Sequence, residues 1–425
     1  MPHQLAVTIR AFVQPGLLAD LEDVLADIAK RGVPNDTLPF DALLGVHFAR
    51  LFVLPEAEDA GGETIRPSLV YMAEVDAPVD RHFAELAEAV GGGVDLLFGH
   101  CVDYPPTPVM PALRVTWLRE HALTGGTTYY VNTVGRGLTQ IRQEAQLREA
   151  IEGLLDQAGA GWVGRSALEV RARIQQFVSG RPDLVWASLE PDEPSLRWRY
   201  METVHAVAVP LVGLALSPIL VPVLPVWAGL LRWHERRDVP GRQRPDPARL
   251  REVAEREDFA AQNPFTAVGV IKPGLFRRVT ASTVLTLVDY GLRHIFNHGS
   301  LTGVKTIHFA RWVFIDEHRR LVFASNYDGS LESYMGDFID LVGWGLNAVF
   351  SNGVGYPRTR WLVLDGARDE QAFKNYLHCR QLVTQVWYSA YPSLTGENIN
   401  TDARLRQGLF GRMTEAEAQT WLALL

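Results

Sequence analysis

The stretch IHFARWVFIDEHRRLVFASNYDGSLESY, from Ile307 to Tyr334, carries a strand pattern, a turn, a second strand and a polar start to a helix. Its HFAR motif at 308–311 occurs a second time at 47–50, again ahead of an apolar strand. Residues 69–105 also match residues 321–357 without a gap, at one constant offset of 252 positions (321 − 69). An ungapped match that keeps strand, turn and helix in step indicates an internal duplication.

The composition is that of an ordinary globular protein. The 425 residues are 47% hydrophobic and 21% charged, with a net charge of −8. This acidic balance argues against a nucleic-acid partner, which would favour a basic face. Two cysteines, Cys101 and Cys379, are too few for a disulfide framework and fit a reducing compartment. The N-terminal residues lack the pattern of a signal peptide, so the sequence predicts a protein that faces the cytoplasm.

Each half of the chain has the pattern β-α-β-β-α-β, which is that of a ferredoxin-like unit. In the first half we expect helices at 17–30, 80–90 and 140–157, and strands at 5–12, 44–54, 68–75, 113–118 and 127–132. In the second half we expect helices at 280–296 and 332–342, and strands at 265–271, 306–315, 320–325, 360–364 and 384–391. The last strands of each half are the expected closing strands. The predicted fold class is therefore α+β.

The chain divides into three predicted parts. Residues 1–160 form the first repeat, 161–262 a helical linker, and 263–425 the second repeat. Two such repeats can bury their open sheet faces by packing against each other. The sequence thus predicts a dimeric α+β barrel made within one polypeptide, with an apolar hairpin inserted between the repeats.

This arrangement resembles the superfamily that contains the dye-decolorizing peroxidases and chlorite dismutases. The resemblance lies in topology and duplication, outside residues 165–260. At motif level, Ser325-Asn326-Tyr327-Asp328-Gly329 is similar to the GxxDG signature of the dye-decolorizing peroxidases, with serine in place of the first glycine. The resemblance implies a heme, with Asp328 moving protons, Arg311 polarising peroxide, and a histidine further along holding the iron. His378 is the histidine that follows Asp328 in this chain.

The segment 204–232 is the second informative stretch. It contains AVAVPLVGLALSPILVPVLPVWAGLL at 206–231, which has no charged residue and exceeds the roughly 20 apolar residues that cross a bilayer. Four prolines argue against one straight helix. Two repeats that pair must share a compartment, so we expect a shallow hairpin that turns near Ser217-Pro218. Basic residues at both ends place both ends on the cytoplasmic side. The alternative is an apolar loop buried in the protein or in the interface of a homo-oligomer.

The HFAR motif permits two interpretations. Strand alternation puts His308, Ala310 and Trp312 on one face and Phe309, Arg311 and Val313 on the other. His308 can serve as a ligand or acid/base, and Arg311 can steady an anion. Alternatively, both are core residues that have found partners. The presence of HFAR in both halves favours the second interpretation for His308.

Polar groups are richer in the second half. Its strand ends carry Asn326, Asp328 and Glu332, and a later stretch adds Tyr388, Tyr391, Asn398 and Asn400. We therefore expect the pocket to be built mainly from residues 300–406, with Asp328, Arg311 and Asn326 as catalytic residues. His308, Glu332, Tyr388, Tyr391, Asn398 and Asn400 are the expected substrate-binding residues. A helical pair, His294 and His298, has the spacing of two metal ligands but also of cationic helix capping.

Two functional classes follow. The first is a membrane-associated, heme-dependent, peroxidase-like oxidoreductase that acts on a lipid or another lipophilic substrate. The second is a non-enzymatic lipid-binding or membrane-scaffold protein with a pocket in its barrel. Either one would be peripheral or monotopic on the cytoplasmic side of a membrane, attached through 204–232.

Overall fold

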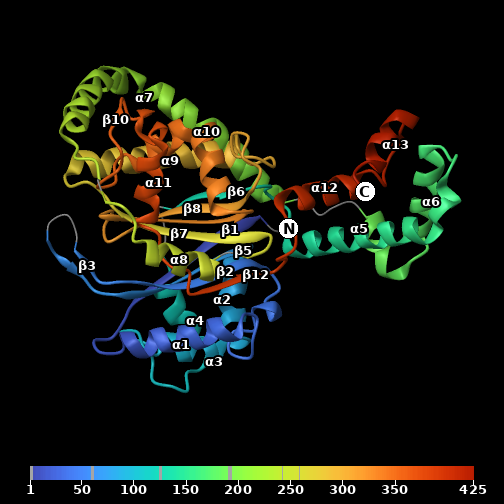
Figure 1. The fold of residues 1–425 in the computed structure, drawn as a ribbon, viewed down its shortest axis with the longest axis horizontal. Coiled ribbons are helices and arrows are strands. Elements are labelled where there is room, and N and C mark those ends of the chain that lie inside the picture. The colour runs from blue at the N-terminus through green and yellow to red at the C-terminus, as the bar shows by residue number, and fades with distance from the viewer. Residues whose placement is uncertain (1–2, 59–61, 124–126, 190–193, 242, 258) are drawn as a thin grey trace.

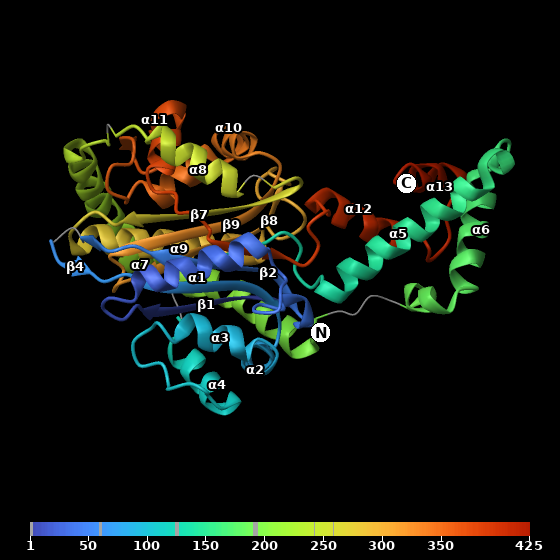
Figure 2. The same ribbon diagram turned by 60° about the horizontal axis from the view of Figure 1, so that its bottom comes forward.

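The computed structural model describes residues 3–425 except 59–61, 124–126, 190–193, 242 and 258. The fold is α+β: two four-stranded antiparallel sheets lie at the centre, and one long apolar helix lies on the outside (Figure 1). A helical arm projects from one end of this body, as Figure 2 shows in a second view.

The two sheets are antiparallel throughout. The first has the order β1-β5-β2-β12, with β1 Gln4–Phe12, β5 Ser68–Asp76, β2 Val46–Leu54 and β12 Val386–Ser389. The second has the order β6-β8-β9-β7, with β6 Thr127–Val131, β8 Ile307–Ile315, β9 Arg320–Asp328 and β7 Gln262–Val270. Two short hairpins lie apart from them: β3 Ala57–Glu58 with β4 Thr64–Ile65, and β10 Thr359–Arg360 with β11 Leu364–Asp365.

The sheets have the same pairing pattern. In each sheet the first residue of one strand lies opposite the aspartate that ends its neighbour. Gln4 of β1 faces Asp76 of β5, and Gln262 of β7 faces Asp328 of β9. In each sheet the strand that carries HFAR has a β-bulge at the histidine, which is His47 or His308. A bulge takes its residue out of the regular alternation of the strand. The predicted alternation of side chains between the two sheet faces therefore holds only from Phe48 and Phe309 onward and does not include the histidines.

Each sheet is closed by a strand from the other half of the chain. β6 pairs with β8, which puts Tyr129 opposite Arg311, and β12 pairs with β2, which puts Trp387 opposite Arg50. The strands expected at 127–132 and 384–391 are thus present, but the expectation that each half closes its own sheet is wrong. An apolar pattern specifies a strand and leaves open which of two similar sheet edges it joins.

The central body has four layers (Figure 1). One hydrophobic core joins the first sheet to the helices on its outer face, α1 Leu18–Arg31, α2 Val79–Glu88, α3 Gly91–Phe98 and α4 Pro111–Glu120. A second core joins the other sheet to α9 Leu275–His294, α10 Leu331–Phe350 and α11 Glu370–His378. Between the sheets lies a third apolar layer that includes Phe52, Met72, Val313 and Val322. The packing of the two sheets face to face agrees with the sequence-based prediction.

One predicted strand is a helix. Residues 113–118 lie in α4, which begins with Pro111. Proline is well suited to the first position of a helix because its missing N–H would have no intrahelical partner there. Trp117 and Leu118 are buried whereas Leu113 is exposed, as expected for a helix with one buried face.

The arm is built from both halves of the chain. Its helices are α5 Leu138–Ala158, α6 Ala167–Ser179, α12 Gly396–Gln407 and α13 Glu415–Leu422, and they share one hydrophobic core (Figure 2). Ion pairs join α5 to α12, between Arg148 and Asp402 and between Glu144 and Arg406. Short helical turns η1 Phe40–Ala42, η2 Gly159–Trp162, η3 Pro182–Ser188 and η4 Gly366–Arg368 complete the fold, together with α8 Pro247–Glu257.

The apolar segment is one helix. α7 runs from Leu196 to Arg237 and contains all four prolines, at 210, 218, 222 and 225 (Figure 1). The expected hairpin at Ser217-Pro218 is therefore wrong. Each proline removes one hydrogen bond and bends the axis, but none of them reverses the chain here. The expectation that the helix is not straight is met, because Figure 1 shows α7 curving over the outer face of the body.

Candidate functional site

The arginines of the two HFAR motifs cross the space between the sheets. Arg311 donates to Glu74 of the opposite sheet, through Nε (3.1 Å) and through Nη2. Arg50 donates to Asn326 Oδ1 (2.6 Å), and each arginine also donates to a main-chain oxygen across the gap. Both arginine side chains are fully buried. Burial lowers the pKa of Arg50 to about 10, opposed by the charge of Glu74, so Arg50 stays charged at neutral pH.

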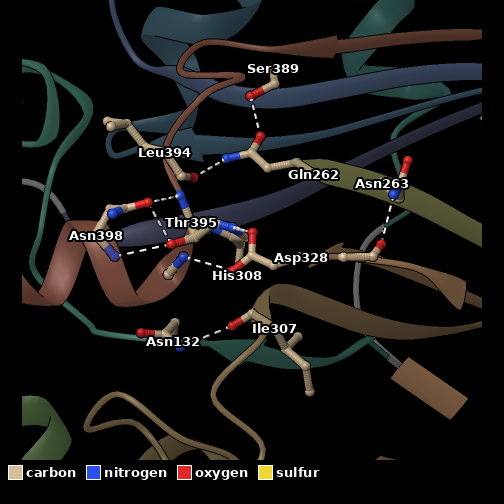
Figure 3. Close-up of polar contacts among 12 residues, drawn as sticks. Asn132, Gln262, Asn263, Ile307, His308, Asp328, Ser389, Leu394, Thr395 and Asn398 are labelled. Atoms are coloured by element: carbon tan, nitrogen blue, oxygen red, sulfur yellow. Dashed lines mark hydrogen bonds and ion pairs between the residues drawn. The ribbon is translucent and has the colours of Figure 1, made fainter. Parts of the chain in front are cut away.

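His308 and Asp328 form a buried pair at the end of the second sheet (Figure 3). His308 Nε2 lies 2.7 Å from Asp328 Oδ1, and Asp328 Oδ2 accepts the main-chain N–H of Gly396 (2.7 Å). Gly396 is the first residue of α12. The carboxylate thus holds a histidine on one oxygen and a helix N-terminus on the other, where the helix dipole favours negative charge.

The first half contains the same arrangement. His47 Nε2 lies 3.0 Å from Asp76 Oδ1, and Asp76 Oδ2 accepts the N–H of Leu138 (2.9 Å), the first residue of α5. His47 Nδ1 lies 3.0 Å from the hydroxyl of Tyr391. These pairs fix the first residues of two arm helices, α5 and α12, to the sheets. The His–Asp pairs and the Arg311–Glu74 ion pair agree with the interpretation in which the histidine and arginine of HFAR are core residues with partners.

The other predicted site residues are spread over several places. Tyr388 packs against Phe40 on the outer face of the first sheet, with ring centroids 5.4 Å apart. Asn398 caps the start of α12. Asn400 accepts a hydrogen bond from Arg136 (2.7 Å). The structure thus places His308, Asp328 and Tyr391 in one cluster and Arg311 and Asn326 in another, and both clusters take residues from both halves.

Glu332 and His378 lie on the outside of the second sheet. Glu332 is exposed and pairs with Lys374 (2.9 Å). His378 Nδ1 lies 3.3 Å from Gln381 Oε1, and its Nε2 lies 4.0 Å from Glu332. Burial lowers the pKa of His378.

The space beside the His308–Asp328 pair is too small for a heme. The cavity beside His308, Tyr391 and Gly396 measures about 30 Å³, which holds a single water, whereas ligand cavities are typically 300–1,000 Å³. Separately, the described residues contain no group of three or more His, Cys, Asp or Glu side chains arranged to hold a bare metal ion. Heme binding stays a prediction of the resemblance, and no step of the proposed function depends on it.

Both ends of α7 are attached to α9. Near the start of α7, Glu202 pairs with Arg293 and Tyr290 donates to the main-chain oxygen of Ala206 (2.7 Å). Near its end, Trp227 donates to Thr280 (3.2 Å). These contacts are farther apart along α7 than along α9. Ala206 and Trp227 are 21 residues apart (227 − 206), a rise of about 32 Å, whereas Tyr290 and Thr280 are 10 apart (290 − 280), about 15 Å. The middle of α7 must therefore bow away from α9, and we call residues 207–226 the arch.

The arch is apolar, and none of its residues is buried. None of the residues in the most apolar 18-residue stretch of α7 is buried, and α7 has the length and composition of a membrane-spanning helix. Leu214 is 70% exposed, Ile219 66% and Val226 63%. Beneath it, α9 and α10 add further exposed apolar side chains, which include Leu275, Val279, Leu287, Leu341 and Trp344. The expected helical pair of His294 and His298 is not formed, because α9 ends at His294 and His298 lies beyond it. His294 Nε2 lies 2.7 Å from His205 Nδ1 of α7, so it helps to attach α7 to α9.

A cavity of about 600 Å³ lies at the start of α7. It opens between the edge strands β1 and β6 and is covered by the first turns of α7 and the last turns of α9. Its walls include Leu5, Val131 and Leu292, and its polar groups include Tyr129, Asp289 and Arg197. No residue from 300–406 lines it. It is thus distinct from the pocket that the sequence predicts in the second half.

Comparison of the chain with models of protein families, with curated proteins and with solved structures finds no match.

Sequence reasoning missed this cavity because its described residues come from segments far apart in the chain, at 3–5, 129–134, 195–202 and 289–293. One signal was present in the sequence. The tails of the two halves match at an offset of 258, with Ile141 over Ile399, and the same offset sets Tyr129 against Trp387. Where one half has the smaller side chain at a matching position, as Tyr129 is smaller than Trp387, that half can have space that the other half fills.

Proposed function

We propose that this protein is a monotopic membrane protein, attached to one leaflet of a bilayer by the arch of α7, and that its two-sheet body is a scaffold rather than a catalytic centre. The observation that carries the proposal is the arch itself: a long, uncharged, apolar stretch of helix in which no residue is buried. Burial of apolar surface away from water is the main driving force for such attachment.

A bilayer suits the arch better than a second copy of the chain. A helix that packs on a protein partner has one apolar stripe, whereas a helix that is apolar all round is surrounded by apolar material. The ends of α7 carry the residues that favour a membrane interface, namely Trp198, Tyr200 and Trp233 with exposed Arg197, Arg199, Arg236 and Arg237.

The attachments to α9 support immersion of the arch over a full crossing. Both ends of α7 bind the same helix of the body, so a crossing would require one set of contacts to break. With both ends held, the bowed middle can enter one leaflet while the body stays on one side.

We also infer that the body arose by tandem duplication of a ferredoxin-like unit. Three observations support this: the matching HFAR bulges, the matching His–Asp pairs at the starts of α5 and α12, and the matching registers of β6 and β12. The duplication requires both halves to lie in one compartment, as a monotopic attachment does.

The test is flotation of the full chain with vesicles of phosphatidylcholine and a minority of phosphatidylglycerol. The variant Leu214→Glu/Ile219→Glu puts two charges on exposed positions of the arch (70% and 66%), so the fold should be unaffected. A charge in the apolar part of a bilayer costs about 2.5–3.5 kcal/mol, so we expect vesicle binding to fall by at least about 100-fold. The matched control, Val163→Glu/Val239→Glu, changes two equally exposed residues outside the arch (83% and 81%). Equal flotation of all three proteins would refute the proposal.

A further inference from the structure

We propose that the end of α7 and the β10–β11 hairpin together bind the phosphate head groups of acidic phospholipids. We call this surface the rim site, and it consists of two tryptophans and three arginines: Trp233, Trp361, Arg236, Arg237 and Arg358. The inference rests on the proposed attachment of the arch to a bilayer, and it adds the class of lipid that the protein selects.

The rim site lies where lipid head groups are found when the arch is in the apolar layer of a leaflet. Trp233 is seven residues beyond Val226, the last residue of the arch (233 − 226), a rise of about 10 Å along a helix. Trp233 is 47% exposed and Trp361 is 49% exposed, and tryptophan is enriched at the boundary between apolar layer and head groups. The guanidinium carbon of Arg237 lies 3.8 Å from the ring centroid of Trp233, and that of Arg232 lies 5.3 Å from the centroid of Trp361. Each ring thus has a positive charge beside it.

The backbone of the β10–β11 hairpin is strained where it presents Trp361. Trp361 and Leu362 have φ angles of 54° and 68°, in the left-handed region that large side chains rarely adopt. Glu235 of α7 holds this conformation, because its buried carboxylate accepts the N–H groups of Trp361 (3.0 Å) and Leu362 (2.7 Å). Leu362 belongs to the same buried apolar cluster as Leu231 of α7. Such strain persists where the surrounding structure fixes it, and it is common at functional sites. Here it keeps an exposed tryptophan beside the end of α7.

The arginines of the rim site have no compensating charge. None of Arg236, Arg237 and Arg358 forms an ion pair with a described carboxylate. The neighbouring carboxylates already have basic partners, in the pairs Glu235–Arg232, Asp238–Lys272, Asp238–Arg277 and Asp365–Arg360.

These three charges lie close together although the chain as a whole is acidic. Arg358 Nη2 donates to the main-chain oxygen of Asp238 (3.0 Å), the residue that follows Arg237. Guanidinium groups form strong, charge-assisted hydrogen bonds with phosphate. Clustered basic residues next to a membrane attachment attract anionic lipids. A phospholipid head group in the leaflet that the arch enters therefore supplies the missing negative charge.

The experiment compares flotation of the full chain with vesicles of phosphatidylcholine alone and with vesicles that also contain a minority of phosphatidylglycerol. We expect the wild type to bind both, because the arch drives attachment, and to bind the acidic vesicles about 100-fold more tightly. At about 1 M salt the Debye length falls to about 3 Å, so this preference should disappear. Arg236→Gln/Arg358→Gln should bind acidic vesicles about 30-fold more weakly, as for the loss of two basic groups near an anionic surface. It should bind phosphatidylcholine vesicles like the wild type.

Two further variants separate the rim site from general effects of charge and folding. Arg165→Gln/Arg173→Gln removes two exposed arginines from the arm and should bind both kinds of vesicle like the wild type. Trp361→Asn keeps every charge and introduces a residue that tolerates the left-handed conformation. It should fold like the wild type, as checked by thermal melting, and bind both kinds of vesicle more weakly.

The outcomes distinguish this inference from the proposed attachment. Equal binding of the two kinds of vesicle by the wild type, equal losses in the two arginine variants, or unchanged binding of Trp361→Asn would overturn the rim site while leaving the arch as an anchor. Loss of the preference on adding glycerol 1-phosphate at constant ionic strength would mean that the arginines take a soluble phosphate, and would also overturn it. Failure of the wild type to bind either vesicle would refute the attachment of the arch and the rim site with it.

Discussion

At the scale of single residues, the polar groups between and beside the sheets hold the body together. Sequence reasoning found many of them, because histidine, aspartate and arginine in an apolar strand need partners when they are buried. It assigned several of them to a catalytic pocket, since a buried pair and an active-site pair have the same residue types. Only the packing distinguishes them: Arg311 and Glu74 are fully buried and bond each other, and their other hydrogen bonds go to Val7, Thr8 and Asn326.

Glu257 provides a pH-dependent test of this packing. Burial raises its pKa to about 7, although its oxygens accept hydrogen bonds from Thr384 N (2.6 Å) and Gln381 Nε2 (3.0 Å). A carboxyl with a higher pKa in the folded chain stabilises the fold fully below its ordinary pKa, and this stabilisation is lost as the pH rises through 7. We expect the free energy of unfolding to fall by up to about 3 kcal/mol from this group between pH 4.5 and 8.

The variant Glu257→Gln cannot ionise, so its free energy of unfolding should fall less over the same pH range. The difference between wild type and variant, measured by urea denaturation at several pH values, isolates this one group. Glu255→Gln, an exposed position on the same helix, is the control and should follow the wild type. Parallel pH curves for Glu257→Gln and the wild type would contradict the assignment.

At the scale of elements, most strands and helices could be predicted from apolar periodicity, but their partners could not. The strands at 127–131 and 386–389 were expected, yet each joins the sheet of the other half. The strand carrying His47 and that carrying His308 offer nearly the same edge, so local sequence cannot choose between them. The prolines of α7 led to a wrong prediction for another reason. Proline destabilises the interior of a helix, so four prolines predicted a turn. The bent helix instead continues through all four.

The attachment of α7 to the body can be tested at Glu235. This carboxylate is buried at the end of α7 and accepts hydrogen bonds from Trp361 N (3.0 Å), Leu362 N (2.7 Å) and the hydroxyl of Thr359 (3.2 Å). Glu235→Ala leaves these donors without partners, at a cost of about 1–3 kcal/mol or more. We expect the end of α7 to detach locally, with trypsin cleavage at Arg236 and Arg237 faster by at least about tenfold. Glu255→Ala is the control, and cleavage at the same rate in both variants would rule out this role.

At the scale of the whole molecule, the body, the arm and the arch have separate tasks. The two sheets and their outer helices form a rigid centre, and the His–Asp pairs fix the arm to it. The arch lies outside the helical layer that covers the second sheet, and α9 of that layer holds both of its ends. This division explains why the richest polar sequence, at 300–406, serves mainly the centre, while the proposed membrane site lies on α7.

The most direct test of the account is the depth of α7 in a bilayer. Single cysteines are placed at Ile219, in the middle of the arch, and at Tyr200 and Arg236, near its ends, in a Cys379→Ser background in which Cys101 is buried. Each is labelled with an environment-sensitive fluorophore, bound to vesicles, and exposed to an aqueous quencher outside them. The account predicts that the label at 219 is protected and that those at 200 and 236 are both quenched. Protection at 200 or 236, with quenching at the other end, would mean that α7 crosses the bilayer and would contradict it.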